Sequence, residues 1–370
     1  MKGQWLGRLE GNDPNGEPGR GFAIVDLDDE GDSLRGTASY FDDDVRLSGT
    51  LARLHFAQSE DTAFEADIVP LDRRGGLVPP GQLATLFPDT IHGTKAKLHL
   101  KKTATGLHVA FETDIGTKGA GLLHQSNPSA TSVLTPLPEV KTWREFTQFV
   151  TSFPVNRRFM FRGQPCTKKL RTSFHRTRRS DLDRFMQNDV PILHRHLTPV
   201  VKHLFKLNDP FELGAFFNLI QHHGYPTPLL DWSYSPFIAA FFAFRERQTE
   251  AEASVRILVF DRQEWCKLPQ YSNVTYLPPH LSVIELLGVE NERMIPQQAL
   301  TTLTNLDDIE DYIAAIETSS AKQFLQAIDL PASERPQALS ELSMMGITAA
   351  SLFPGLDGSC EAMRGQMFGH

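Results

Sequence analysis

The sequence predicts an all-β domain, either a sandwich or a small barrel, followed by an α+β domain. Its 370 residues exceed the length of one average domain. Residues 1–123 consist of short segments in which apolar and polar residues alternate, separated by turn residues. From residue 142 onward, helical segments and strands are mixed. We therefore expect two domains, over 1–123 and 142–370.

The first domain is predicted from its alternation. Segments such as GFAIVDL and GLHVAFETD alternate with the period of two that suits a strand with one buried face. Turn signals recur about every 8 to 12 residues, a spacing typical of antiparallel sandwiches and small barrels. We expect this domain to sense a ligand or to dock a partner, neither of which the sequence identifies.

The stretch 124–141, HQSNPSATSVLTPLPEVK, is rich in Ser, Thr and Pro and has no periodicity, which is typical of a linker. A helix is expected directly after it, because Thr142 and Glu145 have the spacing of a capping box. This helix should extend to about Phe153 and open the second domain.

The second domain continues with a strand at 157–163 and a helical stretch at 181–206 that Pro191 and Pro199 should break or kink. The next helix begins at Asp209 and Pro210 and stops at Gly224. The later predicted elements are strands at 227–232, 254–261, 281–289 and 299–304 and helices at 235–248, 307–317, 333–345 and 358–367.

Charge is unevenly distributed along a chain whose net charge is -8. Acidic runs occupy 26–32 and 42–44, whereas Lys and Arg greatly outnumber acids over 157–206. Such a basic stretch is either a solvated face or a binding face for an anion. The anion would be a nucleotide phosphate, a nucleic acid or the acidic surface of the other domain.

Several classes of protein are not indicated. The longest apolar run, Phe237 to Phe244, is too short to cross a bilayer, and the first residues contain no apolar signal core, so we expect a cytoplasmic protein without membrane insertion. Neither a phosphate-binding loop nor a dinucleotide-binding fingerprint occurs. Cys166, Cys266 and Cys360 have no metal-binding spacing, and we expect reduced, mostly buried thiols and no metal site.

The segment QHHGYPTPLLDWSYSPF, residues 221–237, is the strongest candidate for a site. A helix that stops at Gly224, followed by a short strand, would bring His223, Asp231, Ser233 and Ser235 to one end of the core. The following helix offers an N-terminus that attracts anions. The alternative is that Asp231 only caps this helix and that its neighbour Trp232 belongs to the core.

Five segments together resemble the FRG domain family. They are FRGQ (161–164), TSFHR (172–176), QHHGYPTPLLDWSYSPFIAAFFA (221–243), NERMIPQQAL (291–300) and MGITAASLFPGLDG (345–358). The resemblance covers roughly 142–367 and leaves residues 1–123 without a counterpart. It implies an α+β domain over the second part of the chain and gives no reaction by itself.

The second domain also resembles, more distantly, the ADP-ribosyltransferases. That family has an Arg-Gly strand, a serine motif before an apolar helix and a later strand with a catalytic glutamate. Arg162-Gly163, the run from Trp232 to Ser235, and Glu292 in NERMIP occur here in the same order. The resemblance implies NAD as substrate, with Arg162, Gly163 and Gln164 beside it and Trp232 at the same site.

Physical chemistry gives these residues understandable roles under that resemblance. Arg162 would bind the ribose or pyrophosphate through its fork of donors, and Gly163 would let the dinucleotide approach the backbone. Ser233 or Ser235 would orient the nicotinamide ribose. Glu292 would accept the 2′-hydroxyl and stabilise positive charge at the anomeric carbon. His223 and Asp231 would be an acid/base pair or a brace for the pocket.

The predicted activity is thus ADP-ribosyl transfer to a protein or nucleic-acid acceptor, or hydrolysis of NAD. Glu290 or Glu285 is an alternative to Glu292 as the acidic residue. Two other functions remain open: a hydrolase or nuclease that uses His223 and Asp231, and a non-catalytic module that binds nucleotides or nucleic acid. By analogy alone, a sensor joined to an NAD-consuming domain would suit a bacterial stress or anti-phage effector.

Overall fold

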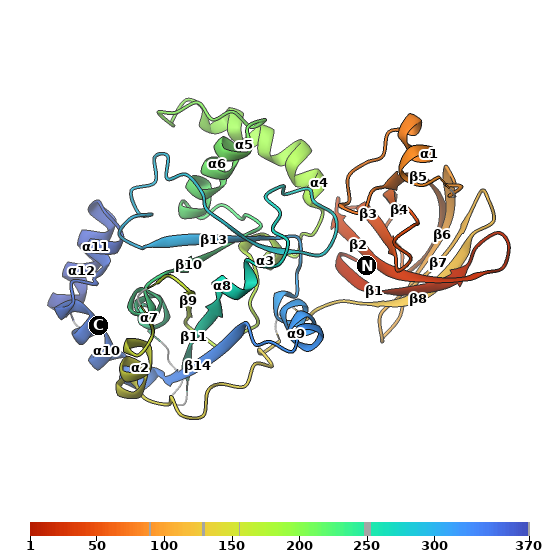
Figure 1. Cartoon of the computed structure of the whole chain (residues 1–370). Coiled ribbons are helices and arrows are strands. Elements are labelled where there is room, and N and C mark those ends of the chain that lie inside the picture. Colours follow the sequence, from red (N-terminus) through yellow and green to blue (C-terminus); the bar gives the residue numbers. More distant parts are fainter. Residues whose placement is uncertain (89, 128–129, 155, 248–252, 369–370) are drawn as a thin grey trace.

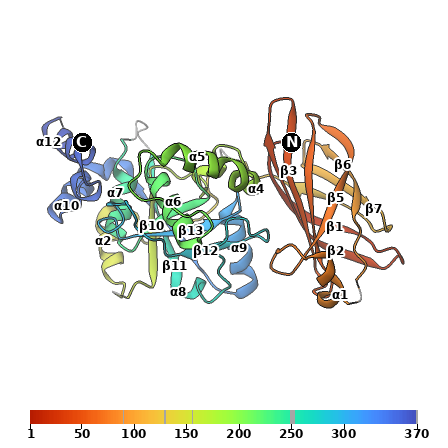
Figure 2. The same ribbon diagram turned by 90° about the horizontal axis from the view of Figure 1, so that it is seen from above.

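The computed structural model describes residues 1–88, 90–127, 130–154, 156–247 and 253–368. Two domains lie side by side, and both views show them as separate bodies with one shared face (Figures 1 and 2). The N-terminus belongs to the β domain, whereas the C-terminal helices lie on the far side of the second domain (Figure 1). The two-domain organisation expected from the change of pattern is confirmed.

The first domain is a closed antiparallel barrel of eight strands. Each strand pairs with the next in sequence, and β1 also pairs with β8, which closes the barrel. The strands are β1 Gly3–Asn12, β2 Pro18–Asp29, β3 Ser33–Asp42, β4 Gly49–Ala57, β5 Asp61–Leu71, β6 Lys95–Lys102, β7 Leu107–Thr113 and β8 Lys118–His124. Of the two predicted all-β architectures, the barrel is the one formed.

The alternation that predicted the strands corresponds to the two faces of the barrel wall. On β4, Leu54 and Phe56 are buried in the barrel core, whereas Arg53 and His55 between and beside them are exposed. Successive residues of a strand point to opposite faces, so a period of two separates core from surface. The interior is filled by side chains of all eight strands, which form one hydrophobic cluster.

The second domain is built on a six-stranded sheet with the order β12-β13-β10-β9-β11-β14. All of its strand pairs are antiparallel. The strands are β9 Phe159–Gln164, β10 Leu229–Ser233, β11 Ser254–Asp261, β12 Leu281–Ile284, β13 Ala299–Thr304 and β14 Leu325–Pro331. The mixed α+β class is confirmed, although the pattern did not predict β14.

Helices surround this sheet. They are α2 Trp143–Thr151, α3 Ser173–Arg176, α4 Leu182–Arg184, α5 Val190–Leu197, α6 Pro210–His222, α7 Pro236–Phe244, α8 Arg262–Trp265, α9 Ile309–Ser320, α10 Arg335–Met344, α11 Ala349–Leu352 and α12 Leu356–Phe368; the barrel domain holds α1 Leu83–Leu86. The predicted capping box at Thr142 and Glu145 is present. The expected helix over 181–206 is shorter: a π-helix, Phe185–Asp189, joins α4 to α5, and α5 ends before Pro199.

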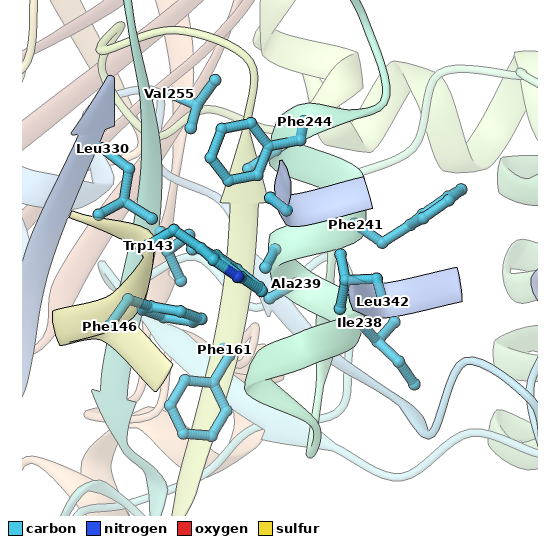
Figure 3. Packing of buried hydrophobic residues seen from close by; sticks show 14 of the residues in the cluster. Trp143, Phe146, Phe161, Ile238, Ala239, Phe241, Phe244, Val255, Leu330 and Leu342 are labelled. Atoms are coloured by element: carbon cyan, nitrogen blue, oxygen red, sulfur yellow. The ribbon is translucent and has the colours of Figure 1, made fainter. Parts of the chain in front are cut away.

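Both faces of the sheet are covered. On β11, Ile257 and Val259 point to a cluster with α2, α7 and α10, in which Trp143 and Phe244 meet edge to face (Figure 3). Leu258 and Phe260 of β11 point to a second cluster that includes α8 and α9. Burial on both faces explains why β11 is a nearly continuous apolar run.

The stretch predicted as a linker lies along the second domain in its described parts. Ser126 Oγ donates to Asp308 over 2.7 Å, and Ser132 Oγ donates to Glu310 over 2.7 Å. Further along the chain, Pro136 forms an isolated parallel β-bridge with Ala327 of β14. Its lack of periodicity therefore reflects irregular backbone that is held by side chains of the second domain.

The two domains meet through polar groups that are buried. Gln4 of β1 donates to the main-chain oxygen of Asn305 over 2.7 Å and accepts from the amide of Asp307 over 2.8 Å. Asp28 of β2 accepts from Arg179 over 2.7 Å and from the amide of Ser180 over 2.8 Å. Of the three anions considered for the basic stretch, the acidic surface of the other domain is bound in this way.

Two further expectations concern the membrane and the thiols. Among the described helices, none combines the length and the apolar composition that crossing a bilayer requires. The expectation of mostly buried thiols is wrong, because Cys266 and Cys360 are exposed and Cys166 is half-buried. Cys360 lies on α12, on a side of the helix that faces solvent.

Candidate functional site

A cavity of about 370 Å³ lies where β9 and β10 diverge. These strands share one pair, Ser233 opposite Phe161. Beyond this pair, β9 continues to bond with β11 as far as Gln164, and β10 continues along β13. The cavity wall is completed by the end of α6, by one side of α7, by the turn before β13 and by Phe353.

Arg162 occupies the gap between the two strands. Its Nη1 donates to the main-chain oxygen of Asp231 over 2.5 Å, which satisfies a carbonyl that the diverging strand leaves open. Its Nε is buried and has no hydrogen-bond partner. Burial lowers the pKa of Arg162 to about 10, and the nearby Asp231 opposes this effect, so the guanidinium stays charged at neutral pH.

Arg162 has no carboxylate within ion-pair distance among the described residues. A buried charge without a partner costs several kcal/mol, on the order of 3 to 5 kcal/mol when a partner is removed from a pair. Proteins seldom keep such a group unless something else binds it. The geometry therefore indicates an anion site at the floor of the cavity.

Asp231 is the carboxylate beside this guanidinium. Its Oδ1 accepts a hydrogen bond from Gln221 Nε2, and Gln221 Oε1 in turn accepts from the hydroxyl of Thr227. The side chain is half-buried and lines the cavity. This chain of hydrogen bonds fixes the orientation of the carboxylate. Its second oxygen has no hydrogen-bond partner among the described residues, so the carboxylate can contact a ligand.

His222 also lines the cavity, at the last position of α6. Its Nδ1 lies 2.7 Å from the main-chain oxygen of Asn218, one helical turn earlier. The side-chain amide nitrogen of Asn291 lies 3.0 Å from the same ring nitrogen. Nδ1 is therefore engaged by the protein, and Nε2 is the ring nitrogen without a hydrogen-bond partner among the described residues. The main-chain oxygen of His222 accepts from Arg293 over 2.9 Å, which ties the turn before β13 to the end of α6.

Two further arginines lie around Phe353 at the rim. The guanidinium of Arg245 is 4.1 Å from the centre of this ring and that of Arg293 is 5.4 Å away. Arg245 is neutralised by a bidentate pair with Glu361, at 2.7 and 2.6 Å. Arg293 has no such carboxylate within the part of the chain that the structure describes. Arg162 and Arg293 are therefore the two cavity cations available to an anion.

Several residues predicted from the serine motif have structural bonds. Trp232 Nε1 donates to Thr302 over 3.0 Å, and Ser233 Oγ donates to the main-chain oxygen of Gln297 over 2.8 Å, although both residues line the cavity. Ser235 accepts from the amide of Ile238 and caps α7, and it does not line the cavity. The serine motif thus shapes the entry to α7.

Two predicted residues of β9 also have packing roles. Gln164 is buried, donates to the main-chain oxygen of Lys168 over 3.0 Å and lies outside the cavity lining. Gly163 lines the cavity, yet a Cβ there would lie 1.8 Å from the carbonyl oxygen of Ala239. The glycine is therefore required for the close approach of β9 to α7, whatever the ligand.

The predicted acid and base positions differ from the residues that the fold brings together. Glu292 is exposed on a turn, where a strand was expected, and it does not line the cavity. Glu290 accepts from the amide of His203, and Glu285 pairs with Arg262 at 3.1 Å. His223 is exposed as the C-cap of α6.

The sequence interpretation missed His222, Arg245, Arg293 and Phe353. His222 directly precedes the predicted His223, and the tertiary structure decides which of these two neighbours reaches the cavity. Arg245, Arg293 and Phe353 come from segments far apart in sequence. Within the described residues, no group of three or more His, Cys, Asp or Glu side chains is placed to hold a metal.

Comparison with known proteins gives one match. Residues 157–252 match the family model of the FRG domain. The matched region contains β9, β10 and the helices α6 and α7, and therefore most of the cavity wall. No curated protein sequence and no solved structure matches the chain.

Proposed function

From the FRG domain that this chain contains at residues 157–252, we propose that its cavity binds NAD and that the protein cleaves the bond between nicotinamide and ribose. The observation that carries the proposal is Arg162, a half-buried arginine whose buried Nε has no hydrogen-bond partner and which has no carboxylate within ion-pair distance among the described residues. A pyrophosphate would satisfy its free donors through charge-assisted hydrogen bonds.

The cavity supports a division of roles. Arg162 on the floor and Arg293 at the rim bind the two phosphates of the dinucleotide. The carboxylate of Asp231, held in place by Gln221, faces the nicotinamide ribose. A volume of about 370 Å³ in an open cavity accommodates half of the dinucleotide. The other half extends past Phe353.

Asp231 replaces Glu292 as the acidic residue in this proposal. In the reaction, the bond from the anomeric carbon to the pyridinium nitrogen breaks, and its electron pair leaves with the nitrogen, so nicotinamide departs neutral. Positive charge develops at the anomeric carbon, and the Asp231 carboxylate stabilises it. Water then attacks this carbon and loses a proton to solvent. An acceptor nucleophile in place of water would give ADP-ribosyl transfer.

Nicotinamide release from NAD by the purified full chain tests the proposal. We expect Asp231→Asn, which keeps the shape but removes the charge, to slow release by about 100-fold. Arg162→Lys should weaken NAD binding at least about 10-fold, because lysine cannot form the fork of donors. Glu292→Gln is the matched control and should remain within about twofold of the unmodified protein, since surface changes are usually small in effect.

Two results would contradict parts of the proposal. If NAD binds in calorimetry but no nicotinamide is released, the domain is a non-catalytic nucleotide-binding module. If Glu292→Gln abolishes release while Asp231→Asn does not, the assignment of the carboxylate is wrong. Absence of both binding and release would remove NAD as the ligand.

A nucleic-acid module is less well supported. The basic stretch over 157–206 forms many of its ion pairs within the chain: Arg179 pairs with Asp28, Lys169 with Asp308 and Arg158 with Asp261. Charges that are already paired release few counterions when a nucleic acid binds. Weak dependence of oligonucleotide binding on salt would agree with this assessment.

A further inference from the structure

The terminal helix α12 presents an apolar face to solvent. Leu356, Met363 and Met367 are 78%, 44% and 68% exposed, and Cys360 between them is exposed as well. These four residues follow one another at spacings of four, three and four, which is the spacing of the a and d positions of a heptad repeat. Leu356 and Met363 occupy d positions, and Cys360 and Met367 occupy a positions. We call this row of four side chains the seam.

The opposite side of α12 holds the helix against its own domain. Gly358 is buried, and a Cβ on it would lie 2.0 Å from the carbonyl oxygen of Phe353. One turn later, Glu361 forms its bidentate pair with Arg245. Ala362 packs against the cluster of α2, α7 and α10. The seam therefore points away from the domain, and α12 lies at its outer edge (Figures 1 and 2).

We propose that this seam binds the α12 seam of a second copy of the chain, with the two helices antiparallel around a twofold axis. In this arrangement, Leu356 forms a layer with Met367 of the second copy, and Cys360 forms a layer with Met363 of the second copy. The seam is complementary to itself because each a position meets a d position.

Charge supports the antiparallel direction. Asp357 and Arg364 both occupy the e position of the heptad, one helical turn on either side of the middle of the seam. Antiparallel helices bring e positions next to e positions, so each Asp357 meets Arg364 of the second copy. Parallel helices would place these residues opposite g positions, where Ser359 and Gln366 carry no charge. Neither Asp357 nor Arg364 forms an ion pair within 4.0 Å among the described residues of its own chain, although Arg364 lies near enough to Glu361 to contribute to the lowered pKa of that carboxyl.

The seam is short. Thirteen residues span about 20 Å, and four side chains per copy form the contact. An interface of this size is typical of reversible association, so we expect a dissociation constant in the micromolar range. Dimerisation would also fix the position of Arg245 at the cavity rim, because Glu361 of α12 forms an ion pair with Arg245.

Sedimentation equilibrium of the full chain over micromolar concentrations tests the proposal. The unmodified protein should form dimers. Met363→Glu places a charge in the seam and should weaken dimerisation at least about 100-fold, because a charge cannot be buried there without a partner. Met344→Glu is the control: this methionine is 78% exposed and lies at the end of α10, outside the seam. Its variant should dimerise like the unmodified protein.

A charge exchange tests the direction of the helices. Asp357→Arg and Arg364→Asp should each weaken the dimer several-fold, and the double variant should restore it. The three substituted positions of α12, Asp357, Met363 and Arg364, are exposed, so circular dichroism and the melting temperature should remain unchanged. A monomer at all concentrations would overturn the proposal, as would a dimer indifferent to Met363→Glu. If the double variant does not dimerise as strongly as the unmodified protein, the antiparallel arrangement is overturned.

Discussion

Arg179 of the FRG domain donates from Nε to the carboxylate of Asp28 in the barrel over 2.7 Å, and the Asp28 side chain is 1% exposed. The same carboxylate accepts from the amide of Ser180 over 2.8 Å. A single buried acid of β2 thus binds both the side chain and the backbone of the segment before α4. This contact gives the two domains a defined relative position.

The first prediction concerns this pair. Arg179→Ala leaves a buried carboxylate without its cation and should lower the free energy of unfolding by about 3 kcal/mol. The control is Arg178→Ala, because Arg178 is exposed directly beside it. Chemical denaturation measures both variants. Equal stabilities of the two variants would show that the ion pair does not hold the domains together.

A second prediction concerns the dependence of stability on pH. Burial, together with the nearby Asp28, raises the pKa of Asp181 from 3.8 to about 6. The folded state therefore binds a proton that the unfolded chain has already lost between about pH 4 and 6. Asp181 lowers stability progressively as the pH rises through this range, and the cost is complete above it.

Asp181→Asn should remove this cost while keeping the helix cap, since asparagine caps helices as well as aspartate does. The stability difference between the variant and the unmodified protein should grow in favour of the variant from pH 4 to about 6 and stay constant above. Denaturation curves at several pH values measure it. A difference that does not vary with pH would contradict the raised pKa.

A third prediction separates packing from ligand binding at Gly163. Gly163→Ala should destabilise the domain by about 3 kcal/mol, because the added methyl group meets the backbone of α7. Gly81→Ala is the matched control, since its Cβ would have no neighbour within 4 Å. Thermal melts compare the two. If Gly163→Ala melts normally and loses only ligand affinity, the glycine serves the ligand and not the packing.

A fourth prediction distinguishes the paired histidines. His222→Ala should weaken NAD binding about 10-fold, the effect of losing one good hydrogen bond. The bond from Arg293 to the main-chain oxygen of residue 222 survives this change. His223→Ala should have little effect, because this side chain is exposed outside the cavity. Calorimetric titration with NAD measures both, and a larger loss for His223→Ala would contradict the placement.

Local signals predicted most elements of the fold. Asp209 with Pro210 and Ser235 with Pro236 start α6 and α7 as expected, because capping depends on side chains within one turn of the helix end. β11 was predicted with its observed bounds for a similar reason, since its apolar run is continuous. By contrast, β14 has charged and polar residues among its apolar ones, and its pairing with β11 is what makes it a strand.

The site was predicted only in part. Arg162 and Asp231 were singled out, and the fold places them together. Glu292 and His223 were expected beside them, but a turn and a helix end direct both to solvent. Arg293 and Phe353 reach the cavity from segments more than a hundred residues away from Arg162, and no local pattern reports such contacts.

The sequence alone determined that a β domain precedes an α+β domain with FRG motifs and where most helices begin, and it singled out Arg162 and Asp231 as candidate site residues. These features depend on alternation, caps and short motifs, whose physics acts within a few residues. Only the tertiary structure decided that the barrel closes, that β9 and β10 diverge around a cavity, and that Asp28 binds Arg179. Closure, divergence and burial depend on contacts between distant segments, and those contacts exist only once the chain has folded.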